Sequence, residues 1–321
     1  MGKGRVIAAG LATAAALSGC ITINLPFPGQ GPLQEDAVSG TGRAKVLVID
    51  LAGLISSHDG DGFLPEPSPV ARIKEELTKA AEDNKVQAVV LRINSPGGTV
   101  TASDIIYHEI RAFKEKRKIP VIASIMDVGA SGGYYVAAAA DKIVAHPSSV
   151  TGSLGVIMLT VNARGLLDKI GVEANAVTSG PKKDMGSPFR AMTEEERTIF
   201  QAVINAFYDQ FLAVVKNGRR NLTPDQVRKL ADGRIYTGEQ ARDLGLVDSV
   251  GYLDDAIGLA KQKAGLTEAT VVVYRRPGAY RNNIYSRLLG GGGNPFAGIS
   301  NLDLATLVRG GTPQFLYLWI P

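Results

Sequence analysis

Short apolar runs alternate with amphipathic stretches through the first half of the chain. The segments 45–55, 86–93 and 120–125 are rich in β-branched residues and carry few charges, which is typical of buried strands. Between them, 68–84 and 102–116 repeat apolar residues at a spacing near 3.6, which predicts helices that each bury one face. Because continuous apolar strands alternate with helices, we expect a mainly parallel α/β sheet covered on both faces.

The second half of the chain is predicted to be mostly helical. Thr193 and Glu196 form a capping-box pattern at the start of a long helix that ends near Lys216. The segment 223–257 has a second capped start and ends in another helix, and 270–276 is a candidate last strand. The long helix carries an apolar stripe that packs either in the core or against another subunit: Ile199, Val203, Phe207, Phe211 and Val214.

The N-terminus has the pattern of a targeting signal. A short basic stretch precedes the apolar run Val6–Leu17, which is long enough for a signal peptide and short for a membrane span. The run ends in "LSGC", and Cys20 is the only cysteine in the chain. This order resembles a bacterial lipobox, which implies a lipid on Cys20 and cleavage just before it. The alternative is an ordinary signal peptide with an incidental cysteine.

Composition divides the chain into four parts. We expect a lipoprotein signal peptide (1–19), a lipidated flexible tether rich in Pro and Gly (20–43), a folded domain (44–265) and a C-terminal extension (266–321). The extension contains a glycine-rich break and closes on six large apolar residues from Phe315 to Ile320, which a monomer would not leave exposed to water. We therefore expect this apolar end to serve assembly or contact with a hydrophobic surface.

Charge and motifs exclude several classes of function. The formal net charge is +4, and removal of Lys3 and Arg5 with the signal peptide would lower it to +2, which does not favour a nucleic-acid partner. No group of His, Cys, Asp and Glu has the spacing of metal ligands, and the sequence contains no P-loop or dinucleotide fingerprint. We expect no metal and no cofactor.

A Gly-x-Ser-x-Gly pattern at Gly129–Gly133 makes Ser131 a candidate nucleophile. The only histidine after it is His146, fifteen residues on, which is too close to follow an intervening acid in an α/β-hydrolase. A Ser-His-Asp triad is therefore disfavoured, and a neutral lysine is the alternative base. Ser131 could instead be a helix cap, a place that serine favours.

Three motifs in order identify a family resemblance. "RINSPGG" (92–98), "ASGGYYVAAAADKIVA" (130–145) and "SGPKKDMGSPF" (179–189) together resemble the SppA-type signal peptide peptidases, serine proteases of the crotonase/ClpP-like fold. The resemblance covers about residues 45–265. It implies an α/β fold with a mainly parallel sheet flanked by helices, assembly into a homo-oligomer, and cleavage of hydrophobic peptides such as signal-peptide remnants.

The resemblance also assigns roles to individual residues. It implies Ser131 as the nucleophile, Lys183 as the general base and Ser153, in "TGSLGV", as the residue that orients the lysine. The oxyanion donors map to the amide of Gly97, with Gly98 nearby, and to the amide of Ser131. Without the family, Gly97 and Gly98 would be a plain turn, Ser153 a buried hydroxyl, and Lys182 and Lys183 solvated surface residues.

The sequence thus favours a membrane-tethered serine endopeptidase of the bacterial envelope, on the exported side of a membrane. One alternative is a non-catalytic lipoprotein that binds peptides or scaffolds partners on the same fold, and another is acyl-CoA chemistry on a crotonase-like fold. Export and the Ser131, Ser153 and Lys183 set disfavour both alternatives.

Anchoring is predicted to depend on Cys20. Cys20→Ser removes the thiol that would carry the lipid, so the variant should lack the acyl mass increment of the wild type. Mass spectrometry of the N-terminal peptide from both proteins checks this, and an unchanged lipid mass in Cys20→Ser would contradict the lipoprotein assignment.

Overall fold

The fold is built on a mainly parallel β-sheet, described by a computed structural model for residues 31–58, 67–276 and 314–320. Its strands lie in the order β1-β11-β2-β3-β5-β6-β10, and β7 and β9 extend it beyond the end of β5. All neighbouring pairs are parallel except β1·β11 and β7·β9. The strands are β1 (Gln34–Ser39), β2 (Lys45–Ala52), β3 (Val86–Ser95), β5 (Val121–Ala130), β6 (Lys142–Ala145), β7 (Val150–Gly152), β9 (Ile235–Thr237), β10 (Ser249–Val250) and β11 (Thr270–Arg275).

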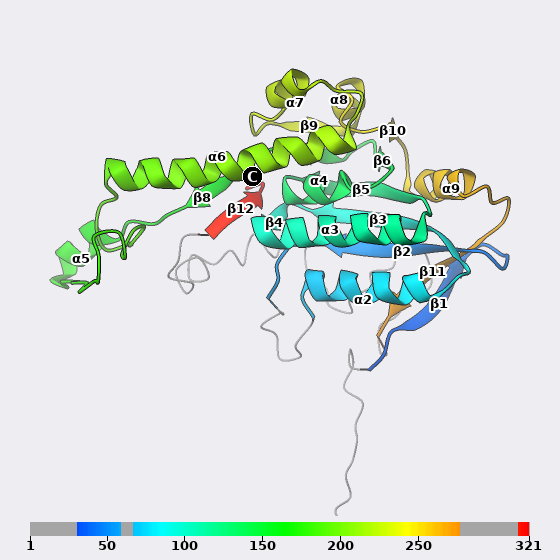
Figure 1. Ribbon diagram of the computed structural model, residues 1–321, viewed down its shortest axis with the longest axis horizontal. Coiled ribbons are helices and arrows are strands. Elements are labelled where there is room, and N and C mark those ends of the chain that lie inside the picture. The colour runs from blue at the N-terminus through cyan, green and yellow to red at the C-terminus, as the bar shows by residue number, and fades with distance from the viewer. Residues whose placement is uncertain (1–30, 59–66, 277–313, 321) are drawn as a thin grey trace, which may run out of the picture.

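Helices cover both faces of this sheet (Figure 1). Alternate residues of β2 point to opposite faces, so Leu47 and Ile49 join the larger core cluster while Val46 and Val48 join the smaller one. The larger cluster includes residues of α2 (Pro69–Glu82), α3 (Val100–Arg117), α4 (Gly132–Ala137), α6 (Glu194–Gly218), α7 (Pro224–Leu230) and α8 (Gly238–Asp243). The smaller cluster is closed by α9 (Leu253–Lys263).

A long arm extends from the body of the molecule. It consists of the short helix α5 (Arg164–Ile170), the segment 171–193 and the N-terminal half of α6, and it projects away from the sheet (Figure 1). The capping box predicted at Thr193 and Glu196 is present in both directions. The C-terminal half of α6 is in the core, where Phe211 and Val215 are fully buried. By length and composition α6 is the one helix of the described residues that would suffice to cross a membrane.

The apolar end of the chain forms part of a second, three-stranded sheet. Strand β12 (Gln314–Leu318) lies between β4 (Gly97–Thr99) and β8 (Ile157–Leu159) and is antiparallel to both. Leu316, Tyr317 and Leu318 are buried. The prediction that this run needs another molecule to cover it is wrong for these three residues, because the chain's own β4, β8 and α6 cover them.

The sequence predicted the fold class and most of its elements correctly, and the structure changes two of the predicted boundaries. Residues 34–39 lie in the predicted tether, yet they form β1 and pair with β11. β11 and β12 lie in the predicted C-terminal extension, yet β11 is inside the main sheet between β1 and β2. The signal peptide and Cys20 lie outside the described residues.

The edge strand β1 should contribute measurably to stability. A soluble chain that starts at Lys45 loses the β1·β11 ladder, the burial of Leu33 and the ion pair between Asp36 and Arg275. Because each backbone hydrogen bond contributes about 0.5–1.5 kcal/mol net, we expect its free energy of unfolding to be on the order of 2–4 kcal/mol below that of a chain starting at Gly31. Urea unfolding of the two proteins measures the difference, and coincident curves would contradict a structural role for β1.

Candidate active site

Ser131 lies at the carboxyl end of β5, in a strained backbone conformation. It is the N-cap residue of α4 with φ 51° and ψ −115°, a region that costs a non-glycine residue about 1–3 kcal/mol. Its N–H donates to the carbonyl of Gly152 at 2.8 Å, which fixes the turn, and its side chain makes no capping hydrogen bond. The alternative of a simple helix cap therefore fails, because the hydroxyl is not used to cap the helix. A strained turn with an uncommitted hydroxyl is typical of a nucleophile.

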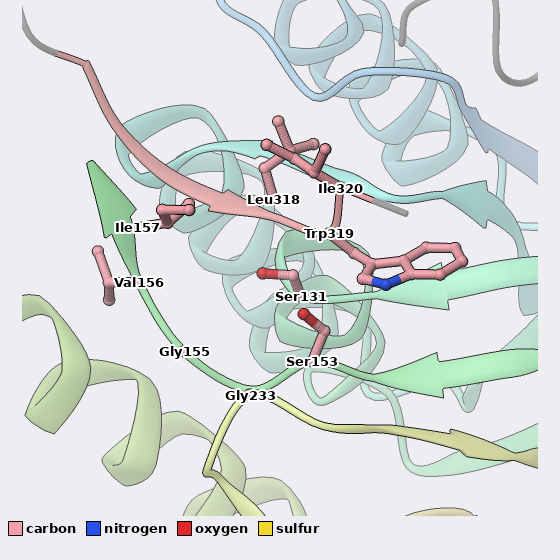
Figure 2. Close-up of a pocket in the computed structure, with 9 residues that line it drawn as sticks. All are labelled: Ser131, Ser153, Gly155, Val156, Ile157, Gly233, Leu318, Trp319 and Ile320. Atoms are coloured by element: carbon pink, nitrogen blue, oxygen red, sulfur yellow. The ribbon is translucent and has the colours of Figure 1, made fainter. Parts of the chain in front are cut away.

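Ser153 lies beside Ser131 in the same cavity. Of the described non-glycine residues, only Lys118, Ser131 and Ser153 have positive φ, so both serines of the pair are held in unusual turns. Ser153 has φ 49°, and its N–H donates to the backbone carbonyl oxygen of Arg234 at 2.7 Å. Both side chains are nearly buried, with 1% exposure for Ser131 and 9% for Ser153. The cavity, of about 240 Å³, is lined by Ser131, Ser153, Gly155, Val156, Ile157, Gly233, Leu318, Trp319 and Ile320 (Figure 2).

Two glycines after β3 bring backbone close to Ser131. A Cβ on Gly97 would lie 1.9 Å from the carbonyl oxygen of Tyr317 and 2.7 Å from the amide nitrogen of Gly132. A Cβ on Gly98 would lie 1.9 Å from the carbonyl oxygen of Ile55. Glycine is required at both positions because any side chain would collide with main chain. We call the space bounded by Gly97, Gly98 and Gly132 the carbonyl-binding site, because a peptide carbonyl of the chain itself occupies it.

The amides expected as oxyanion donors are partly engaged elsewhere. The N–H of Gly97 donates to Ser95 Oγ at 3.1 Å, and that of Ser131 donates to Gly152. The turn and the contact with β7 provide acceptors for these two amides, and their role as oxyanion donors stays a prediction. Gly132, the first residue of α4, has an N–H without an intrahelical acceptor and faces Gly97. Since α4 has only six residues, individual amides matter here more than a helix dipole.

Lys183 is not part of this cavity within one chain. Its side chain is exposed on the arm, and neighbouring Lys182 pairs with Glu195 in the first turn of α6. From Glu194 to Phe211 the helix rises about 25 Å, and Phe211 contacts Tyr135, one turn after Ser131. The sequence therefore identified a lysine that its own chain holds well away from Ser131.

An ion-pair cluster fixes the segment that carries Lys183. Arg190 holds Asp184 with two hydrogen bonds of 2.7 and 2.8 Å and also binds Glu196. Hydrogen bonds from Arg190 lower the pKa of Asp184, and hydrogen bonds from Arg190 and the Thr193 amide lower that of Glu196 to about 2. Both carboxylates remain ionised at neutral pH, so the arm keeps its shape around Lys183.

A histidine base or a metal ion at this site has little support among the described residues. His146 does not line the cavity; its ring lies 2.9 Å from Ser148 Oγ and packs against Tyr252. The residues that the structure describes contain no group of His, Cys, Asp and Glu able to hold a metal ion. The cavity thus offers serine hydroxyls, backbone amides and apolar walls, a set suited to nucleophilic attack on a carbonyl.

The C-terminal segment runs through the site as an extended peptide. Trp319 N–H donates to the carbonyl of Pro96 at 2.9 Å, and the register pairs Leu318 with Gly97 and Tyr317 with Gly98. Leu318, Trp319 and Ile320 then pass Ser131 and Ser153 as part of the cavity wall (Figure 2). The sequence did not predict this, since nothing in an apolar chain end identifies the strand it will join.

A parallel α/β sheet with a strained serine at the carboxyl end of a strand, beside a carbonyl-binding site, defines a ClpP-like serine hydrolase. Family models match this chain as "Clp protease" over residues 68–151 and as "Peptidase family S49" over residues 113–267. The chain belongs to peptidase family S49 and is a serine endopeptidase by family.

Individual relatives are similar over most of this chain. The "Putative signal peptide peptidase SppA" of Enterococcus faecium is 39% identical over 255 residues, which cover 79% of this chain and 74% of that protein. Protease 4 of Salmonella typhi is 39% identical over 71% of this chain, which corresponds to 36% of its own length. A solved structure, a membrane-bound stomatin-specific protease with a substrate peptide, matches with TM-score 0.46 and 18% identity over 73% of this chain and 92% of its own.

Gly97 provides a direct test of the carbonyl-binding site. Gly97→Ala would place a methyl group where a carbonyl enters, so we expect peptide hydrolysis to fall by at least ~10²-fold, comparable to the loss of an oxyanion donor. Gly53→Ala is a matched control, because Gly53 also has positive φ (74°) but nothing lies within 4 Å of its Cβ position.

The two variants are compared by thermal melting and by initial rates on one peptide. Both should lose some stability, whereas only Gly97→Ala should lose activity beyond a few-fold. Equal activity losses in the two variants would mean that backbone strain, not access to the carbonyl-binding site, is responsible.

Proposed function

We propose that this protein is a membrane-tethered serine endopeptidase in which Ser131 attacks a peptide carbonyl held between Gly97, Gly98 and Gly132. The observation that carries the proposal is the Ser131 turn: a strained residue whose hydroxyl makes no capping hydrogen bond, next to Ser153, at a site already filled by an extended peptide segment. Peptide substrates would bind as that segment does, antiparallel to β4, through backbone hydrogen bonds.

The reaction would proceed through an acyl-enzyme. Ser131 Oγ attacks the carbonyl carbon while a neutral lysine amine takes its proton, and the amides of Gly98 and Gly132 donate to the developing oxyanion. The lysine then returns the proton to the departing amine as the peptide bond breaks. Water, deprotonated by the same lysine, attacks the ester carbonyl; as the ester C–O bond breaks, the lysine returns that proton to Ser131 Oγ and the new C-terminal acid is released. Ser153, which lines the same cavity as Ser131, would hold the amine in line.

Lys183 is the proposed base, and it would act on Ser131 of a second copy of the chain. Lys183 is exposed to solvent on the arm, near the end of α6 that is farther from Ser131 of the same chain. The described residues that line the cavity include no lysine, so Ser131 needs a base from elsewhere. Exposed apolar side chains on the same arm, among them Leu166, Ile170 and Val177, favour its burial against a neighbour. A homo-oligomer would thereby complete the dyad and exclude water from the lysine.

The proposed substrates are hydrophobic peptides such as signal-peptide remnants. The relative in Enterococcus faecium carries signal peptide peptidase in its name, and the cavity has apolar walls. A lipid on Cys20 would keep the enzyme at the membrane where such peptides remain after export. We place it on the exported side of that membrane.

A non-catalytic peptide-binding protein is the less favoured candidate. The strained backbone at Ser131 and Ser153 would then have a cost without a function, and the S49 relatives are proteases by name. Mass spectrometry of a synthetic signal peptide after incubation with wild type or Ser131→Ala tests the choice. We expect cleavage by the wild type alone; an intact peptide in both reactions would contradict the proposed function.

If Lys183 is the general base, replacing it should affect activity far more than replacing its neighbour Lys182. Lys183→Met keeps the length of the side chain but removes the amine, so activity should fall by at least ~10³-fold, whereas Lys182→Met, which only breaks a surface pair with Glu195, should cost little. Initial rates of the two purified variants on one peptide measure both effects.

A mixing experiment tests whether the dyad forms between copies. Ser131→Ala and Lys183→Met, each inactive alone, should regain activity when co-assembled, because some interfaces then combine an intact Ser131 with an intact Lys183. Absence of activity in a mixture whose co-assembly is verified by native mass spectrometry would place both residues within one chain. Full activity of Lys183→Met alone would remove this lysine from the mechanism.

A further inference from the structure

Arg190 is the centre of a short ion-pair network at the start of α6. Its Nε and Nη2 atoms donate to the two carboxylate oxygens of Asp184 at 2.7 and 2.8 Å, and its Nη1 atom donates to Glu196 Oε2 at 3.0 Å. Nη2 also binds the other oxygen of Glu196. One planar guanidinium therefore joins two carboxylates at once, a geometry that the single ammonium group of a lysine does not reproduce.

The Glu196 end of this network is fixed to α6. Glu196 is 1% exposed, its Oε2 accepts the N–H of Thr193 at 2.9 Å, and Thr193 Oγ1 accepts the N–H of Glu196 at 3.2 Å. A carboxylate buried to this degree is costly without a cationic partner, so Arg190 is held in place by the helix cap. Asp184 is thereby tied to a helix whose other end is buried in the core at Phe211.

The residues on either side of Lys183 both bind near the start of α6. Asp184 binds Arg190, and Lys182 pairs with Glu195. The Lys182 pair is the weaker of the two contacts, since its side chains are 36% and 71% exposed, against 31% and 23% for Arg190 and Asp184, which are also joined by two hydrogen bonds. The position of Lys183 relative to α6 is therefore set chiefly by Asp184 and Arg190.

We propose that Arg190 is a positioning residue, which through Asp184 sets the place of the Lys183 amine relative to the Ser131 that this amine serves. The inference rests on the proposed function, in which Lys183 of one copy acts on Ser131 of another. The base then reaches the serine only by way of the arm, so a displacement at the end of the arm is carried directly into the dyad. A misplacement of about 1 Å can lower a rate by ~10²-fold. Arg190 itself does not line the cavity.

Two variants break the network at different points. Arg190→Gln removes the guanidinium, whereas Asp184→Ala releases the Lys183 segment and keeps Arg190 beside the buried Glu196. We expect each to lower kcat on a synthetic signal peptide by on the order of 10–10²-fold with little change in KM, because the base moves while the peptide site is untouched. Arg197→Gln is the matched control, since Arg197 follows Glu196 on α6, is 67% exposed, and should not affect kcat. A wild-type kcat in Asp184→Ala, or a change confined to KM, would overturn the proposal.

Mixed oligomers separate positioning of the base from a general effect on the fold. In a mixture of Ser131→Ala with Lys183→Met, only the Ser131→Ala chain supplies the base. Arg190→Gln added to that chain should lower the activity of the mixture by on the order of 10–10²-fold, whereas Arg190→Gln added to the Lys183→Met chain should leave it within about two-fold. Equal losses in the two mixtures would mean that Arg190 supports the fold or the assembly of the arm, and would overturn the proposal.

A double-mutant cycle within one chain tests the same point without mixing. Arg190→Gln should lower the rate of the wild type but not the residual rate of Lys183→Met, because the amine that it positions is then absent. A further loss in the double variant would overturn the positioning role and leave the proposed function intact. If the parental mixture is inactive, the sharing of the dyad between copies fails and the cycle alone decides the role of Arg190. If Lys183→Met keeps full activity, the proposed base and this inference both fail.

Discussion

The site depends on the adjacency of two parallel strands that end at the same edge of the sheet. β3 and β5 are paired along most of their length, and Ser95 lies opposite Gly129 where they finish. Gly97 and Gly98 therefore follow β3 at the place where Ser131 follows β5. The bond from the Ser131 amide to Gly152 then brings β7, and with it Ser153, to the same edge. Nucleophile, neighbouring serine and carbonyl-binding site are consequences of this one arrangement.

The sheet can hold the site in conformations that would be unfavourable in isolation. Positive φ at Ser131 and Ser153 costs about 1–3 kcal/mol at each residue, and the fully buried strands on either side of β5 offset it. Close approach also requires Gly97, Gly98 and Gly132, each of which faces main-chain atoms. The "SPGG" and "ASGG" motifs are recognisable because this geometry excludes other residues.

Strong local signals made most of the fold predictable from sequence. The continuous apolar runs of β2, β3 and β5 and the capping box at Thr193 each have a local physical cause. Ser131 and Ser153, which the family resemblance paired, line one cavity. β1 was missed because Gln34–Ser39 is a largely polar edge strand that only its pairing with β11 defines. The acceptors of the Gly97 and Ser131 amides are set by the geometry of the turns, which a sequence motif does not encode. The distance of Lys183 from Ser131 is set by the path of the arm in three dimensions, which a motif does not encode either.

An active-site-directed fluorophosphonate tests directly whether Ser131 is an activated nucleophile. Attack by Ser131 Oγ on phosphorus would expel fluoride and leave a covalent adduct, which intact-mass measurement detects and peptide mapping locates. We predict one adduct per chain on the peptide that contains Ser131, none in Ser131→Ala, and an adduct retained in a surface control such as Lys182→Met. Equal labelling of the wild type and Ser131→Ala, or an adduct confined to Ser153, would contradict the assignment of Ser131 as the nucleophile.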